Sequence, residues 1–174
     1  MKTKQLVFVS IFSIIIMGCA APSSAPGGKT DKKEVSELTQ KALDEGKMTI
    51  VVNYINPVGS ASFVSTDGYR MKISDGKVSA HLPYFGRSYT PMLYGADEMG
   101  IVFDDCEIEI KEDYSKASRG KYFWRFEAKS GNENIQVLIT FGNDGSAQIS
   151  CNCTNRSSIS YNGDMIEDKP ESKE

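Results

Sequence analysis

Residues Ile135–Cys153 read IQVLITFGNDGSAQISCNC, two alternating runs separated by a turn. Apolar side chains occupy every second position on both sides of Asn143-Asp144-Gly145, which is the pattern of half-buried strands. An Asn-Asp-Gly sequence between two such runs is typical of a β-hairpin. The stretch therefore predicts two antiparallel strands joined by a tight turn.

The same alternation extends outward from this hairpin in both directions. It places candidate strands at residues 48–54, 69–73, 77–82, 106–110, 122–128, 135–141, 147–153 and 159–161, with shorter apolar segments at 61–63 and 100–103. Short intervals between strands, filled by turn residues, are typical of sandwiches and barrels, and hairpin-length links favour a meander. We therefore expect one mainly β domain over residues 33–166, an antiparallel meander of about eight to nine strands that forms a barrel or a sandwich.

The alternation also assigns side chains to the two faces of each strand. The apolar face of the first strand is formed by Met48, Ile50, Val52 and Tyr54. In residues 122–128 the rings of Tyr122, Trp124 and Phe126 share one face, so we expect them in the core rather than on a stacking platform for sugars. The last strand is expected to end at Asn162-Gly163, and residues 167–174 are expected to be a disordered, charged tail.

One helix is predicted before the strands, over residues Lys33–Gly46. Its apolar stripe is formed by Val35, Leu38, Ala42 and Leu43. Asp31 is a plausible N-cap, and Gly46 is a natural residue to end the helix. We expect this helix to cover a sheet edge or one end of a barrel.

The first 18 residues have the organisation of a secretory signal peptide. Lys2 and Lys4 precede an apolar run over residues 6–17 that is too short to span a membrane. The run leads into Ile16-Met17-Gly18-Cys19, which resembles the bacterial lipobox. That resemblance implies cleavage before Cys19 and acylation of this residue. The alternative is an ordinary signal peptide whose cleavage site contains a cysteine.

The predicted anchor also indicates where the protein is located. Several acyl chains on one residue hold a protein on a membrane far more firmly than a single chain does. Residues 19–32 are mostly small and polar, and we expect them to form a flexible tether. Ala20 and Ala21 lack the acidic residue that is associated with retention in the inner membrane. We therefore expect a lipid-anchored cell-envelope protein on the outer membrane of a Gram-negative bacterium.

A long aromatic loop, residues 83–99, is the surface on which we place a candidate site. Pro83 ends the preceding strand because it has no N–H to donate to a neighbouring strand. The side chains that carry the prediction are Tyr84, Phe85, Arg87, Tyr89 and Tyr94. A long aperiodic loop is usually functional or disordered, and this one is too aromatic for plain disorder. The rings either plug one end of the β domain or contact a ligand or partner, with Arg87 available for an anionic group.

Composition and motifs argue against several classes of function. A net charge of -3 does not suit a general nucleic-acid binder. His81 is the single histidine and falls on the polar face of its strand, so it cannot form a multi-histidine metal site. The acidic run Asp104–Glu109 is expected to be a solvated face rather than a calcium site. No nucleophile, zinc-protease, phosphate-loop or dinucleotide motif is present, so we expect no catalysis, metal or cofactor. A hydrolase without a sequence signature is the remaining enzymatic alternative.

Three cysteines follow Cys19. Cys106, Cys151 and Cys153 continue the apolar faces of their strands, and we expect buried thiols. A cross-strand disulfide from Cys106 to Cys151 or Cys153 is the alternative, because an envelope compartment permits it. Cys151 and Cys153 lie too far apart along an extended strand to pair with each other.

Several segments together resemble a known family. They are the run from Tyr69 through the LPYFG sequence at residues 82–86, GIVF at 100–103, NDGSA at 143–147 and ISYNG at 159–163. These segments look like domain-of-unknown-function family 4251, a group of small Bacteroides-type lipoproteins. The resemblance implies a secreted, lipid-anchored, mostly β protein, and it implies no reaction and no catalytic residue.

These observations favour a non-catalytic envelope binding module. Its site would be the 83–99 loop, and its partner would be an unknown small ligand or an envelope protein. The alternative is a structural protein that assembles with another envelope protein through the same aromatic side chains or through a sheet edge.

Overall fold

The computed structural model describes residues 35–89 and 100–168, which belong to one compact unit of the chain, Lys32–Glu174. Helix α1 (Glu37–Glu45) comes first. The strands follow as β1 (Met48–Pro57), β2 (Phe63–Val64), β3 (Arg70–Ser74), β4 (Lys77–Pro83), β5 (Gly100–Glu107), β6 (Lys111–Asp113), β7 (Lys121–Ser130), β8 (Glu133–Gly142), β9 (Ser146–Cys153) and β10 (Ile159–Ile166). A short 3-10 helix, η2 (Ala117–Arg119), lies between β6 and β7.

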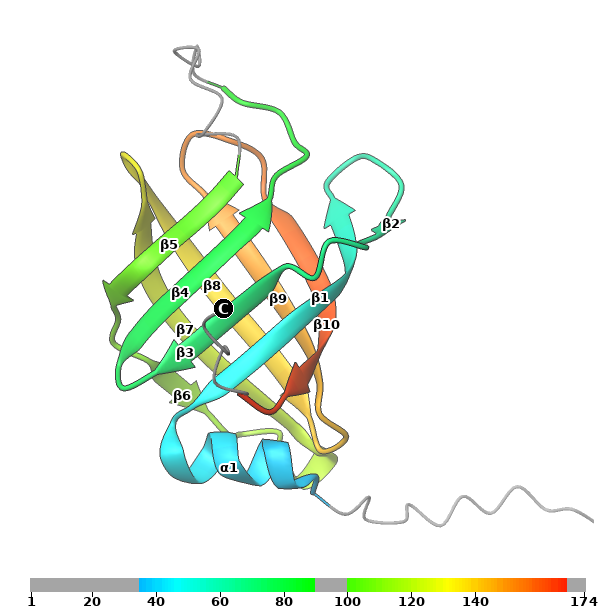
Figure 1. Ribbon diagram of the computed structural model, residues 1–174, viewed down its shortest axis with the longest axis vertical. Coiled ribbons are helices and arrows are strands. Elements are labelled where there is room, and N and C mark those ends of the chain that lie inside the picture. The colour runs from blue at the N-terminus through cyan, green and yellow to red at the C-terminus, as the bar shows by residue number, and fades with distance from the viewer. Residues whose placement is uncertain (1–34, 90–99, 169–174) are drawn as a thin grey trace, which may run out of the picture. The chain divides into compact units, whose positions relative to one another are not determined.

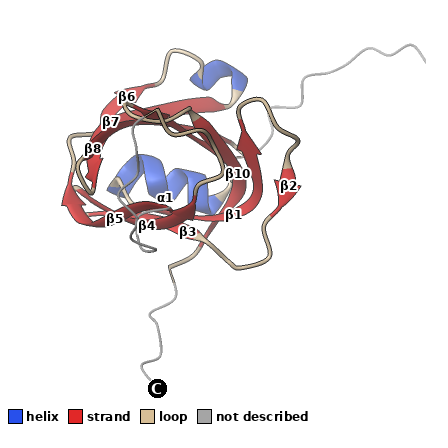
Figure 2. Cartoon of the chain, turned by 90° about the horizontal axis from the view of Figure 1, so that it is seen from above, coloured by secondary structure: helices blue, strands red, loops and turns tan. Residues whose placement is uncertain are grey.

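The strands of the described residues form one antiparallel sheet that curls into a half-barrel (Figures 1 and 2). The strand order is β5-β4-β3-β1-β10-β9-β8-β7-β6, with β2 paired to β1. The predicted mainly β, antiparallel class with one N-terminal helix is confirmed. The first and last strands, β1 and β10, lie side by side in the middle of the sheet. The sheet therefore consists of two meanders, β1-β3-β4-β5 and β10-β9-β8-β7-β6, joined by the pairing of β1 with β10.

The hairpin predicted over residues Ile135–Cys153 is confirmed. Strand β8 pairs with β9 so that Ile139 lies opposite Ile149 and Phe141 opposite Ala147. Gly145 has a φ of 79°, a backbone conformation that glycine adopts without steric cost. The turn residues thus set the register, and the register places the apolar side chains of both strands on one face.

A bulge in β1 makes one predicted side-chain orientation wrong. The register with β10 shifts between Val52 and Tyr54, so Ile55 takes the next core position and Tyr54 is 49% exposed. The opposing Gly163 explains how the strands fit, because a Cβ at this position would lie 1.9 Å from the Val51 carbonyl oxygen. The extra residue turns Tyr54 outward, which the simple alternation did not anticipate.

The predicted strand over residues 106–110 is wrong beyond Glu107, because strand β5 runs from Gly100 through Glu107 and no strand includes Ile108–Ile110. Glu107 lies opposite Lys77, the first residue of β4, so the pairing ends there. A second bulge shifts the register of β5 with β4 between Val78 and Ala80. Asp105 has a φ of 44°, and its carboxylate accepts a hydrogen bond of 2.7 Å from the Ser79 hydroxyl.

Strand β10 continues beyond its predicted end. Asn162-Gly163 does not stop the strand, which runs to Ile166 and buries Met165. The reason is the pairing with β1, because Val51 lies opposite Asp164 and Thr49 opposite Ile166. A long-range partner therefore overrides a local turn signal.

Helix α1 starts later than predicted and covers one end of the half-barrel (Figure 2). It begins at Glu37 because the Ser36 side chain caps it, accepting a hydrogen bond from the Thr39 amide at 3.1 Å. The predicted cap, Asp31, lies outside the described residues. Gly46 ends the helix with a φ of 67°, as predicted. The Thr39 hydroxyl donates to the Gly142 carbonyl at 2.9 Å, which docks the helix onto the β8–β9 turn.

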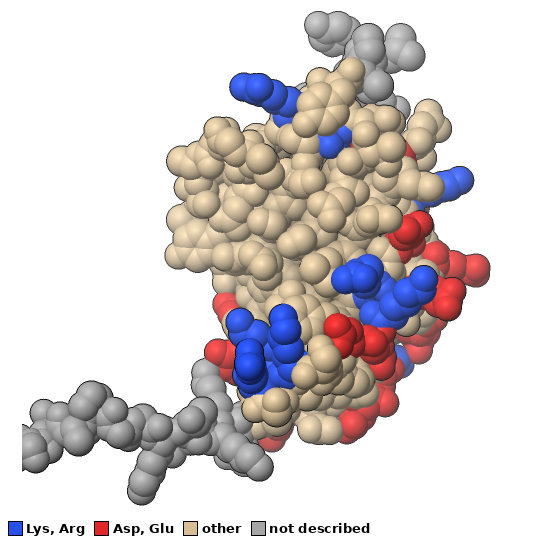
Figure 3. All heavy atoms as spheres, turned by 180° about the vertical axis from the view of Figure 1, so that it is seen from behind, with Lys and Arg blue, Asp and Glu red and all other residues tan. Residues whose placement is uncertain are grey.

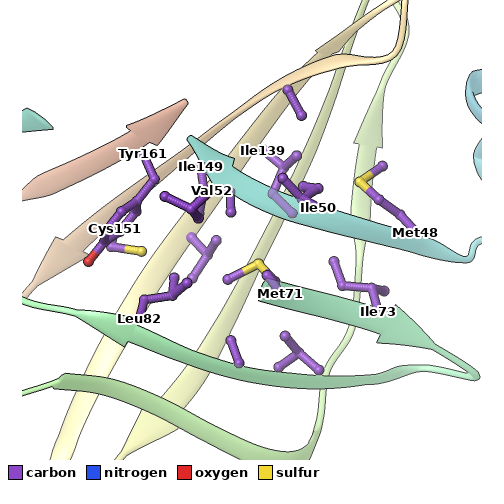
Figure 4. Packing of buried hydrophobic residues seen from close by; sticks show 14 of the residues in the cluster. Met48, Ile50, Val52, Met71, Ile73, Leu82, Ile139, Ile149, Cys151 and Tyr161 are labelled. Atoms are coloured by element: carbon purple, nitrogen blue, oxygen red, sulfur yellow. The ribbon is translucent and has the colours of Figure 1, made fainter. Parts of the chain in front are cut away.

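The concave side of the sheet is filled by apolar side chains from every long strand (Figure 4). Trp124 and Phe126 are buried, so the prediction that they belong to the core is confirmed. Trp124 contacts Phe141 edge to face, with the ring centroids 5.3 Å apart. Within residues 35–89 and 100–168, no helix has the length and apolar character needed to cross a bilayer.

Candidate functional site

The 83–99 loop leaves the sheet at the end opposite α1 (Figure 1). Its two ends are held together, because Pro83 of β4 pairs with Gly100 of β5. The Tyr161 hydroxyl of β10 donates a hydrogen bond to the Pro83 carbonyl at 2.8 Å. Burial raises the pKa of this phenol well above its usual range. The beginning of the loop is thus fixed by a buried side chain from the other half of the sheet.

Tyr84 is buried beneath the loop rather than presented on it. Its hydroxyl lies 2.9 Å from both the carbonyl and the hydroxyl oxygen of Ser157, and 3.2 Å from the Arg87 carbonyl. Burial raises the pKa of the Tyr84 phenol. Gly86 is needed for this arrangement, because a Cβ there would lie 2.3 Å from the Tyr84 hydroxyl oxygen. The Tyr-Phe-Gly sequence therefore lets the chain fold tightly over its own tyrosine.

A buried ion pair supports the same end of the half-barrel. The Arg156 Nε donates to the Glu133 carboxylate at 2.7 Å, and the two side chains are only 6% and 8% exposed. The second carboxylate oxygen of Glu133 accepts a hydrogen bond of 2.6 Å from the backbone N–H of Asn155. Arg156 also donates through Nη1 to the Gly100 carbonyl at 3.1 Å, which fixes the far end of the loop. Its guanidinium lies 4.5 Å from the centre of the Tyr84 ring, a cation–π contact.

This ion pair was not predicted from the sequence. Glu133 lies between the predicted strands at residues 122–128 and 135–141, but the alternation of Ile135 and Val137 continues backward onto Glu133 and places it on the inward face. This alternation could have predicted from the sequence that Glu133 is buried. Arg156 lies in a connection without periodicity, so its sequence neighbours give no indication of burial.

Three of the predicted binding residues are exposed, in contrast to the buried Tyr84 and Arg156. Phe85 is 51% exposed, Tyr89 is 70% exposed, and Arg87 is also exposed. The backbone of this segment pairs with residues 155–157, through Ser157 N–H to the Arg87 carbonyl and Tyr89 N–H to the Asn155 carbonyl, both 2.9 Å. The exposed side chains are therefore carried on an anchored backbone. Tyr94 lies outside the described residues.

A second segment brings further apolar side chains to this end. The Phe63 ring of β2 contacts the Phe85 ring edge to face, with centroids 4.9 Å apart and an interplanar angle of 78°. We name the exposed set at this end the apolar tip: Tyr54, Val58, Phe63, Val64, Phe85 and Tyr89, each 38–70% exposed. Seen from behind, the molecule has few charged side chains towards this end and many towards the helix end (Figure 3). The tip thus combines aromatic and aliphatic surface with little charge.

Comparison with known proteins identifies the family. A family model described as a domain of unknown function, DUF4251, matches residues 30–165. The chain belongs to the DUF4251 family. The crystal structure of a DUF4251 family protein from Bacteroides eggerthii has 17% sequence identity to it and a TM-score of 0.52. The match covers 73% of this chain and 83% of the other. No curated protein matches the sequence.

The resemblance found in the sequence is therefore confirmed at the level of the family. The LPYFG sequence that carried it occupies the end of β4 and the first turn of the loop, where Tyr84 and Gly86 have the packing roles described above. In this DUF4251 protein the motif is thus explained by local packing, and it points to no reaction.

His81 and three cysteines are the remaining candidates for chemistry. His81 is exposed on β4, as predicted. Cys106, Cys151 and Cys153 are free thiols, so the structure contains none of the disulfides considered for them. Cys151 is buried as expected, whereas Cys106 and Cys153 are only half-buried. Burial is the main cause that raises the pKa of the Cys153 thiol to about 11. No cluster of three or more His, Cys, Asp or Glu side chains within the described ranges is placed to hold a metal ion.

Proposed function

We propose that this protein is a lipid-anchored component of the cell envelope that acts as a non-catalytic binding module. The anchor is Cys19, at the end of a lipobox-like sequence, and the expected location is the outer membrane of a Gram-negative bacterium. The binding surface is the 83–99 loop, including Phe85, Arg87, Tyr89 and Tyr94.

One observation carries the proposal. Tyr84 is buried and hydrogen-bonded to Ser157, while the neighbouring Phe85, Arg87 and Tyr89 are exposed. A segment whose backbone is held by hydrogen bonds and whose described large side chains are exposed suits recognition, because these residues lose little further freedom on binding. Aromatic residues and arginine are enriched at binding surfaces. Tyr84 supports the surface, whereas the exposed side chains supply the contacts.

Site-specific photo-crosslinking in intact cells tests the binding surface. A photoreactive amino acid replaces Tyr89, and a matched control replaces Tyr114, an aromatic residue that is 38% exposed but lies beside β7, outside the loop. We expect adducts from position 89 and none above background from position 114. Equal yields at the two positions, or no adduct at 89, would remove the proposal.

The anchor has a separate test. Cys19→Ala removes the thiol that would be acylated, so we expect the protein to move from the membrane fraction to the soluble fraction. Cys106→Ala is the control, and it should leave the distribution unchanged. Retention of the Cys19→Ala protein in the membrane fraction after an alkaline carbonate wash would contradict the lipid anchor.

The exposed aliphatic side chains favour a second candidate, assembly with another envelope protein. Val58 and Val64 are 66% and 62% exposed beside the aromatic loop, and exposed apolar patches often mark protein interfaces. For this candidate the adduct from position 89 would be one discrete polypeptide. Light scattering on the purified protein would show whether that polypeptide is a second copy of the chain.

A further inference from the structure

The apolar tip is formed by two segments that are distant in sequence and lie together at one end of the half-barrel. Phe63 and Phe85 link them by an edge-to-face contact. Tyr54 lies opposite Val64 in the pairing of β1 with β2, which brings these two side chains into the same region. Aromatic and aliphatic side chains are thus presented together, and the predicted loop supplies only part of the set.

Charged residues are few in the described segments that carry the tip, although Asp67 follows the first of them and Asp97 and Glu98 belong to the part of the 83–99 loop outside the described residues. Residues 56–66 contain no Asp, Glu, Lys or Arg, and residues 83–89 contain only Arg87. The neighbouring connection, residues 153–160, contains only Arg156, whose charge is buried against Glu133. The only exposed charge within these three segments is therefore one cation, in a protein whose net charge is -3.

This combination matches the chemistry of a bilayer interface. Tyrosine rings concentrate at the headgroup level, and apolar side chains enter the boundary between headgroups and acyl chains. Carboxylates are unfavourable there, whereas an arginine can place its aliphatic stem in the boundary and its guanidinium at a lipid phosphate. A fluid surface also needs no shape complementarity, which suits side chains that project from two separate loops.

We propose that the apolar tip docks onto the surface of a lipid bilayer, with Phe63, Phe85 and Val64 at the acyl boundary and Arg87 at a lipid phosphate. This inference rests on the proposed function and names the partner of the same surface. The DUF4251 domain would then contact the membrane at two places, through the acyl group at Cys19 and through the tip.

The length of the N-terminal segment permits this arrangement. Ser36 is the N-cap of α1, and α1 lies at the end of the half-barrel away from β2 (Figure 1). The 17 peptide links from Cys19 to Ser36 can span at most about 60 Å, whereas a ten-residue strand such as β1 is about 33 Å long. The chain between anchor and domain is therefore long enough for the tip to reach the bilayer that holds the acyl group.

Tryptophan fluorescence of the full-length acylated protein in vesicles tests the docking. Tyr89→Trp reports on the tip, and Tyr114→Trp is the matched control away from it. Both variants are made in a Trp124→Phe background, so that each contains a single tryptophan, because Trp124 Nε1 donates to the Tyr114 hydroxyl at 3.4 Å and its signal would change in the control. Vesicles contain phosphatidylcholine with a minority of phosphatidylglycerol, with or without bromine on the acyl chains. We expect the tryptophan at position 89 to shift to the blue and lose most of its intensity with brominated lipid, and that at position 114 to do neither.

A second variant separates docking from the presence of the anchor. Val64→Asp adds a carboxylate to an exposed position of the tip, so it should leave the fold intact and restore solvent-like emission in the Tyr89→Trp background. Equal quenching at positions 89 and 114, or no effect of Val64→Asp, would overturn the docking. Absence of quenching at 89, together with a discrete protein adduct in cells, would reject the bilayer and leave the binding module standing. Absence of quenching at 89 together with absence of any adduct, to protein or to lipid, would reject both.

Discussion

Replacing Arg156 by alanine should be among the most destabilising changes at the tip end of the half-barrel. The substitution removes the cation beside the Glu133 carboxylate, whose side chain is only 8% exposed, and leaves the backbone N–H of Asn155 as its donor. Removing one partner of a buried ion pair costs about 3–5 kcal/mol, because the other charge stays buried without compensation. The lost contact with the Tyr84 ring acts in the same direction. A domain of this size is stable by only about 5–15 kcal/mol, so the loss is a large fraction of the total free energy of unfolding.

Urea unfolding followed by circular dichroism measures this loss. The double variant Arg156→Met/Glu133→Leu is the informative comparison, because replacing both charges by apolar groups of similar volume is often neutral. We expect the double variant to recover most of the free energy of unfolding that Arg156→Ala loses. Lys47→Ala is the surface control, since Lys47 and Asp75 form an ion pair of 3.0 Å with side chains 44% and 74% exposed. It should leave the unfolding midpoint almost unchanged.

Two results would refute this reasoning. The first is a loss of stability in Arg156→Ala no greater than that of the surface control, which would mean that water reaches Glu133 in the folded protein. The second is a double variant that loses as much stability as Arg156→Ala, because the loss would then come from side-chain volume and from the hydrogen bond to the Gly100 carbonyl rather than from an unpaired charge.

Three further predictions follow from close contacts and from burial. Gly86→Ala should lower the melting temperature and increase amide exchange around Tyr84, because the new methyl group overlaps the Tyr84 hydroxyl; unchanged exchange there would contradict the packing described. Gly163→Ala should be more severe and should prevent accumulation of folded protein, since its Cβ would meet the Val51 carbonyl, which belongs to the backbone and cannot rotate away; a normal circular dichroism spectrum would refute this. Stability should fall as pH rises above about 9, because the Cys153 thiol loses its proton near its ordinary pKa of 9.0 when unfolded and only near about 11 when folded. Urea titrations from pH 7 to 10 would show the slope, and Cys153→Ala should reduce it.

The strands could be predicted from the sequence because their apolar side chains alternate. Residues 122–128, 135–141 and 147–153 lie within β7, β8 and β9, and their inward faces are the ones expected. The prediction failed at the two bulges, in β1 beside Val52 and in β5 beside Ala80. A bulge is a property of two paired strands, so a pattern read along one strand does not contain it.

The location of the candidate surface could be predicted, whereas its internal arrangement could not. Loop length and aromatic content indicated residues 83–99. Tyr84 is buried and Phe85 is exposed because the Tyr84 hydroxyl bonds to Ser157. Ser157 is 73 residues from Tyr84 in the sequence and adjacent to it in space. The contribution of Phe63 to the tip had no local signal either, because it arises from a contact between two loops.

The hydrogen bonds that hold the 83–99 loop do not involve the side chains that are proposed to bind a partner. Tyr161 bonds the Pro83 carbonyl, and Arg156 bonds the Gly100 carbonyl, so both ends of the loop are fixed by side chains that reach backbone atoms. A backbone carbonyl is present whatever residue occupies the position, so these bonds do not depend on the side chains between residues 85 and 99. Substitutions at Phe85 or Tyr89 should therefore change binding with little effect on unfolding, whereas substitutions at Arg156 or Tyr161 should affect both. A binding variant that also unfolds early would show that the exposed side chains help to hold the loop, and the separation would be lost.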